Sequence, residues 1–261
     1  MPTGSRAKPP ESVALRAGTA GWSIHKAAAD LFPAAGSHLE RYAARFDAVE
    51  INSSFYREHR VATWARWART VPAGFRFSAK IPREITHVRR LVDCGPLIER
   101  FVEGPAALGT RAGPLLVQMP PSLAFDATVA ARFLDAFRRH WSGSLVAEPR
   151  HPSWFDGDGD ALLARFGAGR VAADPAVVPA AAEPGGSEDV VYWRLHGSPR
   201  IYYSAYSPEF LLRVARRAAA CRTAREVWCI LDNTALGAAA RDAAMVAAAR
   251  GSRPTMPVGN G

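Results

Sequence analysis

The stretch from Glu148 to Trp154 combines residue types that do chemistry with the spacing expected at the end of a strand. An apolar run at residues 144–147 ends in Glu148, and Arg150 and His151 follow between two prolines. This pattern is typical of a buried parallel strand that delivers charged side chains to a site, followed by a loop that proline keeps stiff. Its carboxylate, guanidinium and imidazole favour acid–base chemistry or anion binding. A structural ion pair between Glu148 and Arg150 explains this segment alone equally well.

Polar or aromatic residues end many other apolar runs of the chain. With the first stretch included, the set comprises Trp22, Glu50, Asn52, Lys80, Gln118, Glu148, Arg150, His151, Asp174, Arg194, His196, Asp232 and Asn233. If the runs are parallel strands, these residues converge on one face of the fold. We expect Glu50, Glu148 and His196 to carry acid–base catalysis there, with burial raising the pKa of one carboxyl above that of the other. The alternative is that cations hold both glutamates ionised in a structural network.

The same face should also bind the substrate. Lys80, Arg150 and Arg194 could receive a phosphate or carboxylate, because arginine offers a two-pronged donor and lysine a point charge. Aromatic side chains could stack on a sugar or base, although packing under loops explains each of them equally well. The predicted substrate-binding residues are Trp22, Asn52, Tyr56, Lys80, Gln118, Arg150, His151, Trp154, Asp174, Arg194, Tyr202, Tyr206, Asp232 and Asn233, with Phe55 as a further wall.

The sequence predicts no cofactor. Oxygen and nitrogen ligands for Mg²⁺ or Mn²⁺ are present in Glu50, Glu148, Asp174, His196 and Asp232, so a divalent metal is the minority alternative. Arginines would compete with a metal ion for these carboxylates. The three cysteines, Cys94, Cys221 and Cys229, lack metal-ligand spacing and are expected to be buried, inert thiols without a disulfide.

Strand-like and helix-like runs alternate along the chain, which predicts the elements that position these residues. The expected strands are 15–20, 48–52, 75–80, 114–118, 144–148, 170–174, 190–196 and 227–231, and the expected helices are 38–46, 61–70, 94–108, 126–140 with Asp126 as its cap, 161–166, 208–221 and 236–249. Residues 81–87 are predicted as a long polar loop, and 175–189 as a connection poor in helix. We therefore expect an α/β fold, a (β/α)₈ TIM-type barrel, as a single domain over residues 13–250. Tails at 1–12 and 251–261 are predicted to be disordered. A doubly wound open sheet is the main alternative.

The formal net charge of +9 suggests nucleic acid as an alternative partner. Only Lys8, Lys26 and Lys80 are lysines among 33 basic residues, and the arginines lie scattered beside many alanines. A proteome-wide preference for arginine explains this without a polyanion. No apolar run of about 18 residues is present, and the first ten residues lack the core of a signal peptide, so we expect a cytoplasmic protein without a membrane span.

Seven blocks of the sequence resemble the YecE-like proteins, domain-of-unknown-function family seventy-two. They are Gly18-Thr-Ala-Gly-Trp22, Val49-Glu-Ile-Asn-Ser-Ser-Phe-Tyr56, Phe75-Arg-Phe-Ser-Ala-Lys80 with Ile85-Thr-His87, Gly113-Pro-Leu-Leu-Val-Gln118 with Pro120-Pro-Ser-Leu123, Glu148-Pro-Arg-His-Pro-Ser-Trp154, Arg194-Leu-His-Gly197 and Asp232-Asn-Thr234. The resemblance covers residues 15–244 and implies a TIM-type barrel, but no reaction. Asp232 stands where the family leads us to expect asparagine or another small polar residue, and the 157–159 region is degenerate.

Three hypotheses about function follow. The first is a hydrolase, lyase or isomerase that acts on a small anionic or polyhydroxylated substrate at the strand ends. The second is a nuclease or repair-type protein that uses the basic surface. The third is a barrel that binds a metabolite without transforming it. Fold alone cannot choose among them, because barrels host many chemistries.

Overall fold

Strands and helices alternate through residues 15–249, the part of the chain that the computed structural model describes. The strands are β1 (Leu15–Thr19), β2 (Ala48–Ile51), β3 (Arg76–Lys80), β4 (Ala112–Gln118), β5 (Leu145–Glu148), β6 (Ala168–Arg170), β7 (Ala172–Asp174), β8 (Gly185–Gly186), β9 (Val190–Leu195) and β10 (Glu226–Leu231). The α-helices are α1 (His38–Ala43), α2 (Val61–Thr70), α3 (Gly95–Ala106), α4 (Ala127–His140), α5 (Asp158–Arg165), α6 (Pro208–Ala220) and α7 (Ala238–Ala249). The predicted tails at 1–12 and 251–261 lie outside the described residues.

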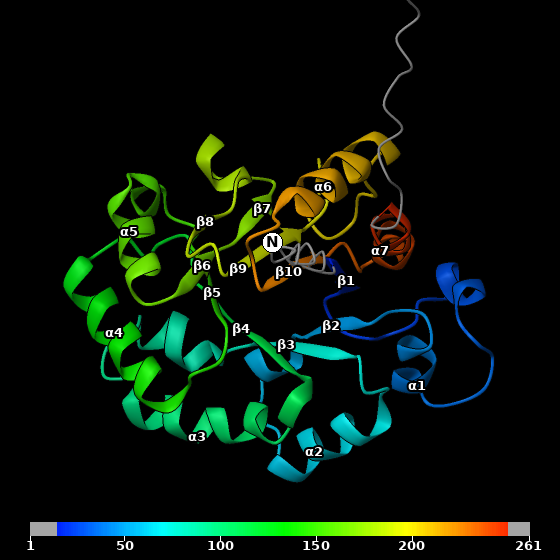
Figure 1. Cartoon of the computed structure of the whole chain (residues 1–261), viewed down its shortest axis with the longest axis horizontal. Helices are drawn as coiled ribbons and strands as arrows, with labels where there is room; N and C mark the ends of the chain where they lie inside the picture. The colour runs from blue at the N-terminus through cyan, green and yellow to red at the C-terminus, as the bar shows by residue number, and fades with distance from the viewer. Residues whose placement is uncertain (1–14, 250–261) are drawn as a thin grey trace, which may run out of the picture.

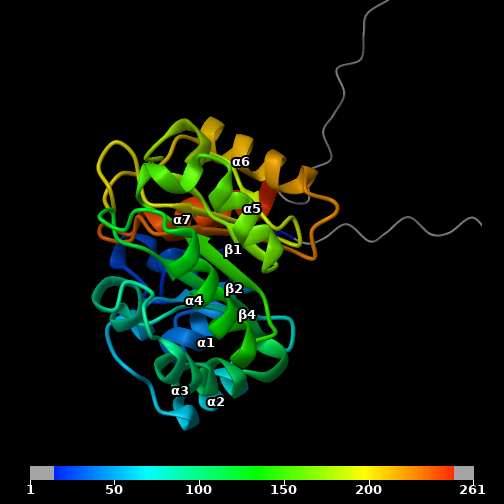
Figure 2. The same ribbon diagram turned by 90° about the vertical axis from the view of Figure 1, so that its left-hand side faces the viewer.

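Two largely parallel sheets form the centre of the fold. Their strand orders are β1-β10-β9-β7 and β2-β3-β4-β5-β6-β8, and only the pairing of β6 with β8 is antiparallel. The helices lie around the outside of the strands, with α6 on the opposite side from α2 and α3 (Figures 1 and 2). The core between strands and helices contains large apolar side chains such as Trp64, Phe77, Phe137 and Leu231. The prediction of an α/β fold with parallel strands is confirmed.

The two sheets meet at two seams. Between β1 and β2 there is one parallel bridge, Ala20 to Glu50, and the phenol of Tyr42 accepts a hydrogen bond from Thr19 N at 2.9 Å and donates one to Ala48 O at 3.0 Å. At the other seam, the predicted strand 170–174 is divided, because β6 pairs with β5 while β7 pairs with β9. Closure of all strands into one cylinder therefore stays a prediction.

Helix ends follow simple chemical signals. The side chain of Asp126 accepts hydrogen bonds from Thr128 N at 2.9 Å and Val129 N at 3.0 Å, so the predicted cap of α4 is confirmed. Helix α5 begins at Asp158, earlier than the predicted 161, since Asp158 and Asp160 place negative charge in its first turn.

The two predicted irregular connections have different outcomes. The polar loop predicted at 81–87 is wrong, because residues Glu84–Val88 form a π-helical turn that buries Ile85 and Thr86. The connection 175–189 holds only a 3₁₀ turn, Pro179–Ala182, and the two-residue β8, so its lack of α-helix is confirmed. Across residues 15–249, every helix is too short or too polar to cross a bilayer.

Candidate functional site

Arg194, near the end of β9, lies at the centre of a buried network of charges. Its guanidinium donates to both carboxylate oxygens of Glu50, from Nε at 3.0 Å and from Nη2 at 2.6 Å. Nη1 donates to Glu148 Oε2 at 2.7 Å, and Nη2 also reaches Asp232 Oδ2 at 3.2 Å. Arg194 and Glu148 are 1% and 0% exposed, so one guanidinium joins the carboxyl groups of three strand ends away from water.

His196 and Arg150 extend this network. The His196 ring lies 3.0 Å from Asp232 Oδ2 through Nδ1 and 2.9 Å from Glu148 Oε1 through Nε2. Arg150 Nη2 lies 2.7 Å from the same Nε2 and pairs with Glu148 Oε1. Nε2 can either donate to Glu148 or accept from Arg150, but it cannot do both. Movement of a proton onto or off Nε2 therefore has to be matched by movement of Arg150.

The charges stabilise one another electrostatically. Burial alone would raise the pKa of Glu148, but Arg194, Arg150 and His196 hold this pKa well below its usual range. Burial would lower the pKa of Arg194, but Glu50, Glu148 and Asp232 hold it well above its usual range. Asp232 behaves like Glu148: burial acts to raise its pKa, and Arg194 and His196 lower it overall. The lowered pKa values of Glu148 and Asp232 favour their ionised forms, which for Glu148 agrees with the structural alternative weighed above.

Lys80 is a different kind of cation. It is 8% exposed, and its Nζ lies 3.9 Å from the centroid of the Phe55 ring. Within residues 15–249 its ammonium forms no ion pair within 4.0 Å and no side-chain hydrogen bond. Burial first, and then the charge of Arg194, lower the pKa of Lys80 to about 8, although Glu50, Glu148 and Asp232 act in the opposite direction. Losing the proton is therefore easier for this amine than for an ordinary lysine.

Two residues of the network were missed by the sequence analysis. The hydroxyl of Tyr192 donates to Glu50 Oε2 at 2.9 Å and lies 3.0 Å from Ser78 Oγ. Burial, and secondly the charge of the Glu50 carboxylate, raise the pKa of Tyr192 well above its usual range. Tyr192 precedes Arg194 by two residues on β9, so both point to the same face of the sheet. The strand period alone could have identified Tyr192.

The predicted polar residues outside the network have local partners. Gln118 donates to Met119 O at 2.6 Å, His151 caps the 3₁₀ turn Pro152–Phe155 through Ser153, and Asp174 accepts from Tyr206 at 2.8 Å. Asn233 donates to Ser204 O at 2.9 Å and to Asp242 at 2.7 Å. None of these contacts joins the charged network, so the structure brings together only part of the predicted site.

The aromatic residues divide in the same way. Trp154 is 3% exposed, packs against Phe125 and donates to Leu123 O at 3.0 Å, so it is held largely within the core. Trp22 packs against Trp67, and Tyr206 stacks on Phe210, both as part of the core. These three residues follow the packing alternative.

Three other aromatic residues lie at the strand ends. Tyr202 is 49% exposed, and its ring stands perpendicular to the His196 ring at 6.2 Å. Its φ of +70° is uncommon outside glycine and indicates a constrained position beside the network. Tyr56 is 76% exposed and packs edge-on against Phe55.

Several buried polar atoms at the strand ends have no hydrogen-bond partner among the described residues. They are Arg150 Nε and Asn52 Oδ1, and Asn233 Oδ1 after β10 is a third. Buried polar atoms are nearly always satisfied in folded proteins, so each of these needs a water molecule or a ligand atom as its partner. Arg150 Nε is a donor and the two amide oxygens are acceptors, which suits a ligand that carries both types of group.

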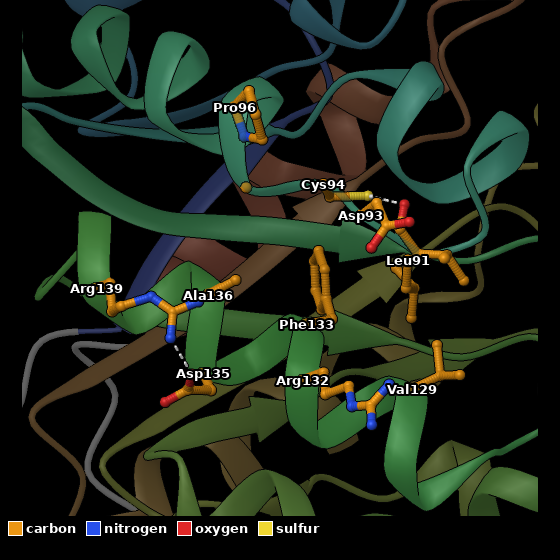
Figure 3. Close-up of a pocket in the computed structure, with 12 residues that line it drawn as sticks. Leu91, Asp93, Cys94, Pro96, Val129, Arg132, Phe133, Asp135, Ala136 and Arg139 are labelled. Carbon is orange, nitrogen blue, oxygen red and sulfur yellow. Dashed lines mark hydrogen bonds and ion pairs between the residues drawn. The ribbon is translucent and has the colours of Figure 1, made fainter.

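A cavity of about 540 Å³ lies apart from the network, between residues 91–96 and α4 (Figure 3). Phe133 and Leu91 line it, with the ion pair of Asp135 and Arg139 at its side. Cys94 also lines it, but burial raises the pKa of this thiol to about 11, which makes it a poor nucleophile. This cavity contains no predicted site residue and no cluster of reactive groups.

Comparison with known proteins gives the family. The family model described as "Protein of unknown function DUF72" matches residues 16–259 of this chain. The chain belongs to the DUF72 family. The UPF0759 protein YecE of Escherichia coli strain K12 is 31% identical over 118 residues, which are 45% of this DUF72 chain and 43% of YecE. The matched part thus spans less than half of the curated relative.

Two solved DUF72 structures share the fold. A DUF72 family protein from Enterococcus faecalis V583 has a TM-score of 0.76 at 20% identity, over 92% of this chain and 96% of that one. A DUF72 family protein from Thermotoga maritima MSB8 has a TM-score of 0.75 at 24% identity, over 89% of this chain and 97% of that one. At these identities the likeness concerns the fold alone.

The donor set of this DUF72 chain bears on the metal alternative. Across residues 15–249, no group of three or more His, Cys, Asp or Glu side chains is arranged to hold a metal ion. Guanidinium groups occupy the carboxylates of Glu50, Glu148 and Asp232, and Asp174 is bonded to Tyr206 instead. The residues present therefore fit a metal ion poorly. Besides its carboxylates, the site contains the cations of Lys80, Arg150 and Arg194 and the imidazole of His196.

Proposed function

We propose that this DUF72 protein is an enzyme that binds a small anionic or polyhydroxylated substrate over the charged network and transforms it by acid–base chemistry of the hydrolase, lyase or isomerase type. One observation carries the proposal: next to a buried network of ion pairs, Lys80 keeps an ammonium without a counter-ion in contact, and Arg150 keeps a buried Nε without a partner. A structural network alone gains nothing from a buried donor without a partner, such as Arg150 Nε, or from an ammonium without a carboxylate beside it. A ligand with negative charge satisfies both.

The network suggests a division of roles. Glu50 is 0% exposed and both its oxygens are occupied, so we assign it to holding Arg194 rather than to proton transfer. Asp232 and Glu148 hold the two ring nitrogens of His196, Nδ1 and Nε2, and we assign proton transfer to this ring when Arg150 moves. Lys80, Arg150 and Asn52 contact the substrate, with Tyr202 and Phe55 beside it. This reading needs no resident metal ion.

We further propose that the two sheets act as one (β/α)₈ barrel. The bridge from Ala20 to Glu50 and the hydrogen bonds of Tyr42 support continuity at one seam, and the shared segment 168–174 supports it at the other. In such barrels the ends of several strands build the active site. That is the arrangement in which Glu50, Lys80, Glu148 and Arg194 meet.

Anion binding gives the direct test. We expect inorganic phosphate and small carboxylates to bind at millimolar concentration, measured by calorimetry, and Arg150→Gln to weaken binding at least about 10-fold, because a charge-assisted hydrogen bond is worth about 1.5–3 kcal/mol. Arg100→Gln is the matched control, since Arg100 is exposed and, within residues 15–249, pairs only with Glu58. Equal affinity in both variants would refute the site. Glu148→Gln is a poor test, because it leaves buried cations unpaired and costs stability as well.

Turnover separates the enzyme from a passive binder. Sugar phosphates and hydroxy acids that bind are incubated with the protein and followed by NMR, and we expect one of them to be transformed. Ligands recovered unchanged after long incubation favour the metabolite-binding alternative. The nucleic-acid alternative gains no support from the network, because its central guanidinium, that of Arg194, is buried against carboxylates. Salt-sensitive binding of DNA or RNA that Arg150→Gln leaves unchanged would favour that alternative.

A further inference from the structure

Lys80 combines features that anion binding alone does not require. An anion site is served as well by arginine, and this chain uses arginine for all but three of its 33 basic residues. Arginine stays protonated and cannot act as a nucleophile, whereas a lysine in a desolvated site can lose its proton. Lysine at the end of β3, beside an otherwise arginine-based network, therefore points to a role for the amine itself.

We propose that the Lys80 amine is the nucleophile of this site and forms a Schiff base with the carbonyl carbon of a small anionic aldehyde or ketone. This inference rests on the proposed function and gives it a substrate class, an anionic carbonyl compound, and a reaction class, lyase or isomerase. Lys80 touches the substrate and is a catalytic residue in this scheme.

The surroundings of Lys80 suit both states of the amine. No carboxylate of the described chain lies within 4.0 Å of Nζ, so no ion pair has to break before the amine attacks. Burial and Arg194 bring the pKa of Lys80 to about 8, which leaves neutral amine available. The Phe55 ring lies against one side of Nζ at 3.9 Å, so the carbonyl carbon approaches from another side. Glu50, Glu148 and Asp232 are near enough to favour the positive charge that returns with the iminium ion.

The step balances without an oxidant or reductant. The Nζ lone pair forms a bond to the carbonyl carbon while the carbon–oxygen double bond opens. The nitrogen gives up two protons in total, the oxygen receives both, and the carbon–oxygen bond breaks with release of one water molecule. Protonation of the imine nitrogen then yields an iminium ion. This ion draws electrons from an adjacent C–H or C–C bond, the step that isomerases and lyases need.

Reductive trapping tests the proposal on the full-length protein. The protein is mixed with pyruvate, dihydroxyacetone phosphate or glyceraldehyde 3-phosphate, sodium borohydride is added, and peptide mass spectrometry locates any secondary amine. Lys26 is exposed and serves as an internal reference. We expect Lys80 to be trapped at least about 10-fold more than Lys26 at pH 7. The yield at Lys80 should rise between pH 7 and about 8 and then level off, because the pKa of Lys80 is lowered to about 8.

Matched variants separate this inference from the proposed function. Lys80→Arg keeps the positive charge and should keep phosphate binding within a few-fold, while trapping and turnover are lost; Lys26→Arg should change none of these. Trapping of Lys80 no greater than that of Lys26, with phosphate binding intact, would overturn the Schiff base and leave the anion site standing. If the Lys80→Arg variant still turns over the substrate, Lys80 is not the nucleophile. If phosphate binds to Arg150→Gln as tightly as to the wild type, the proposed function itself is refuted.

Discussion

At the scale of single residues, the site contains one group whose charge costs stability. The pKa of Lys80 is lowered to about 8, so the folded protein disfavours the ammonium relative to the unfolded chain. Below pH 8 both states carry the proton and the full cost applies. Between about pH 8 and 10.4 the unfolded chain binds more protons, so stability rises with pH until the cost is gone. A residue that destabilises the fold in this way is more readily explained by function than by packing.

Replacing Lys80 by methionine should therefore stabilise the protein at neutral pH. The lowered pKa corresponds to a cost on the order of 3 kcal/mol, and we expect Lys80→Met to recover about 1–3 kcal/mol at pH 7. The gain should shrink steadily between pH 8 and 10. Urea unfolding at pH 7 and pH 9.5 measures it, with Lys26→Met as the control that stays within about 0.5 kcal/mol. A variant that is less stable than the wild type at pH 7 would show that Lys80 supports the fold.

Residue types at strand ends indicated most of the network, but not its internal arrangement. Glu50, Lys80, Glu148, Arg194, His196 and Asp232 were all identified from the sequence, as were Arg150 and the ion-pair alternative. Sequence cannot show which carboxylate oxygen meets which guanidinium nitrogen, because that depends on strand register. It also could not show that Trp154 is held in the core at 3% exposure by its contact with Phe125. Tyr192 was missed because tyrosine within an apolar strand is usually core.

At the scale of elements, predictions succeeded where a local signal acts alone. Helix α2 has the predicted bounds, Val61–Thr70, and α4 begins directly after its predicted cap, Asp126. The π-helical turn at Glu84–Val88 was missed, since its polar residues favour a loop and only tertiary packing buries Ile85 and Thr86. The division of the segment 168–174 between two partner strands was missed for the same reason.

The cap of α4 permits a clean test at this scale. Removal of the Asp126 carboxylate leaves the amides of Thr128 and Val129 without their acceptor, so Asp126→Ala should cost about 1 kcal/mol. Asp126→Asn keeps an oxygen acceptor and should lie within a few tenths of a kcal/mol of the wild type. Urea unfolding midpoints compare the two variants. Equal stability of Asp126→Ala and Asp126→Asn would mean that water replaces the cap at no cost.

At the scale of the whole molecule, the alternation of strands and helices predicted an α/β fold. It did not predict how the two sheets are joined. The β1–β2 seam lacks a regular ladder, and Tyr42 supplies the missing partners for Thr19 N and Ala48 O. Tyr42 lies on α1, so no pattern within the strands could indicate this role. Burial is the main cause that raises the pKa of the Tyr42 phenol, so the hydroxyl stays protonated and can donate its hydrogen bond.

Gly18 decides how closely β1 approaches β2. A Cβ atom at this position would lie 2.1 Å from Ala48 O and 3.1 Å from the Tyr42 hydroxyl. Real Cβ atoms do not come so near to a backbone oxygen, so Gly18→Ala has to push the strands apart and break the hydrogen bonds of Tyr42. Overpacking costs about 1–3 kcal/mol, and each buried group left unsatisfied costs about 1–3 kcal/mol more. We therefore expect Gly18→Ala to lower the free energy of unfolding by at least about 3 kcal/mol.

Gly74→Ala is the matched control for this seam, because a Cβ there meets nothing within 4 Å, and it should change stability by less than about 0.5 kcal/mol. Urea unfolding compares the two variants. Native-state hydrogen exchange adds a local readout, since the amide of Thr19 should exchange faster in Gly18→Ala than in Gly74→Ala if the Tyr42 contact opens. If both variants unfold and exchange alike, the sheets are not joined at β1 and β2. The strand ends of the two sheets would then be free to separate, and a site built across them, with Glu50 on one and Arg194 on the other, could not hold its geometry.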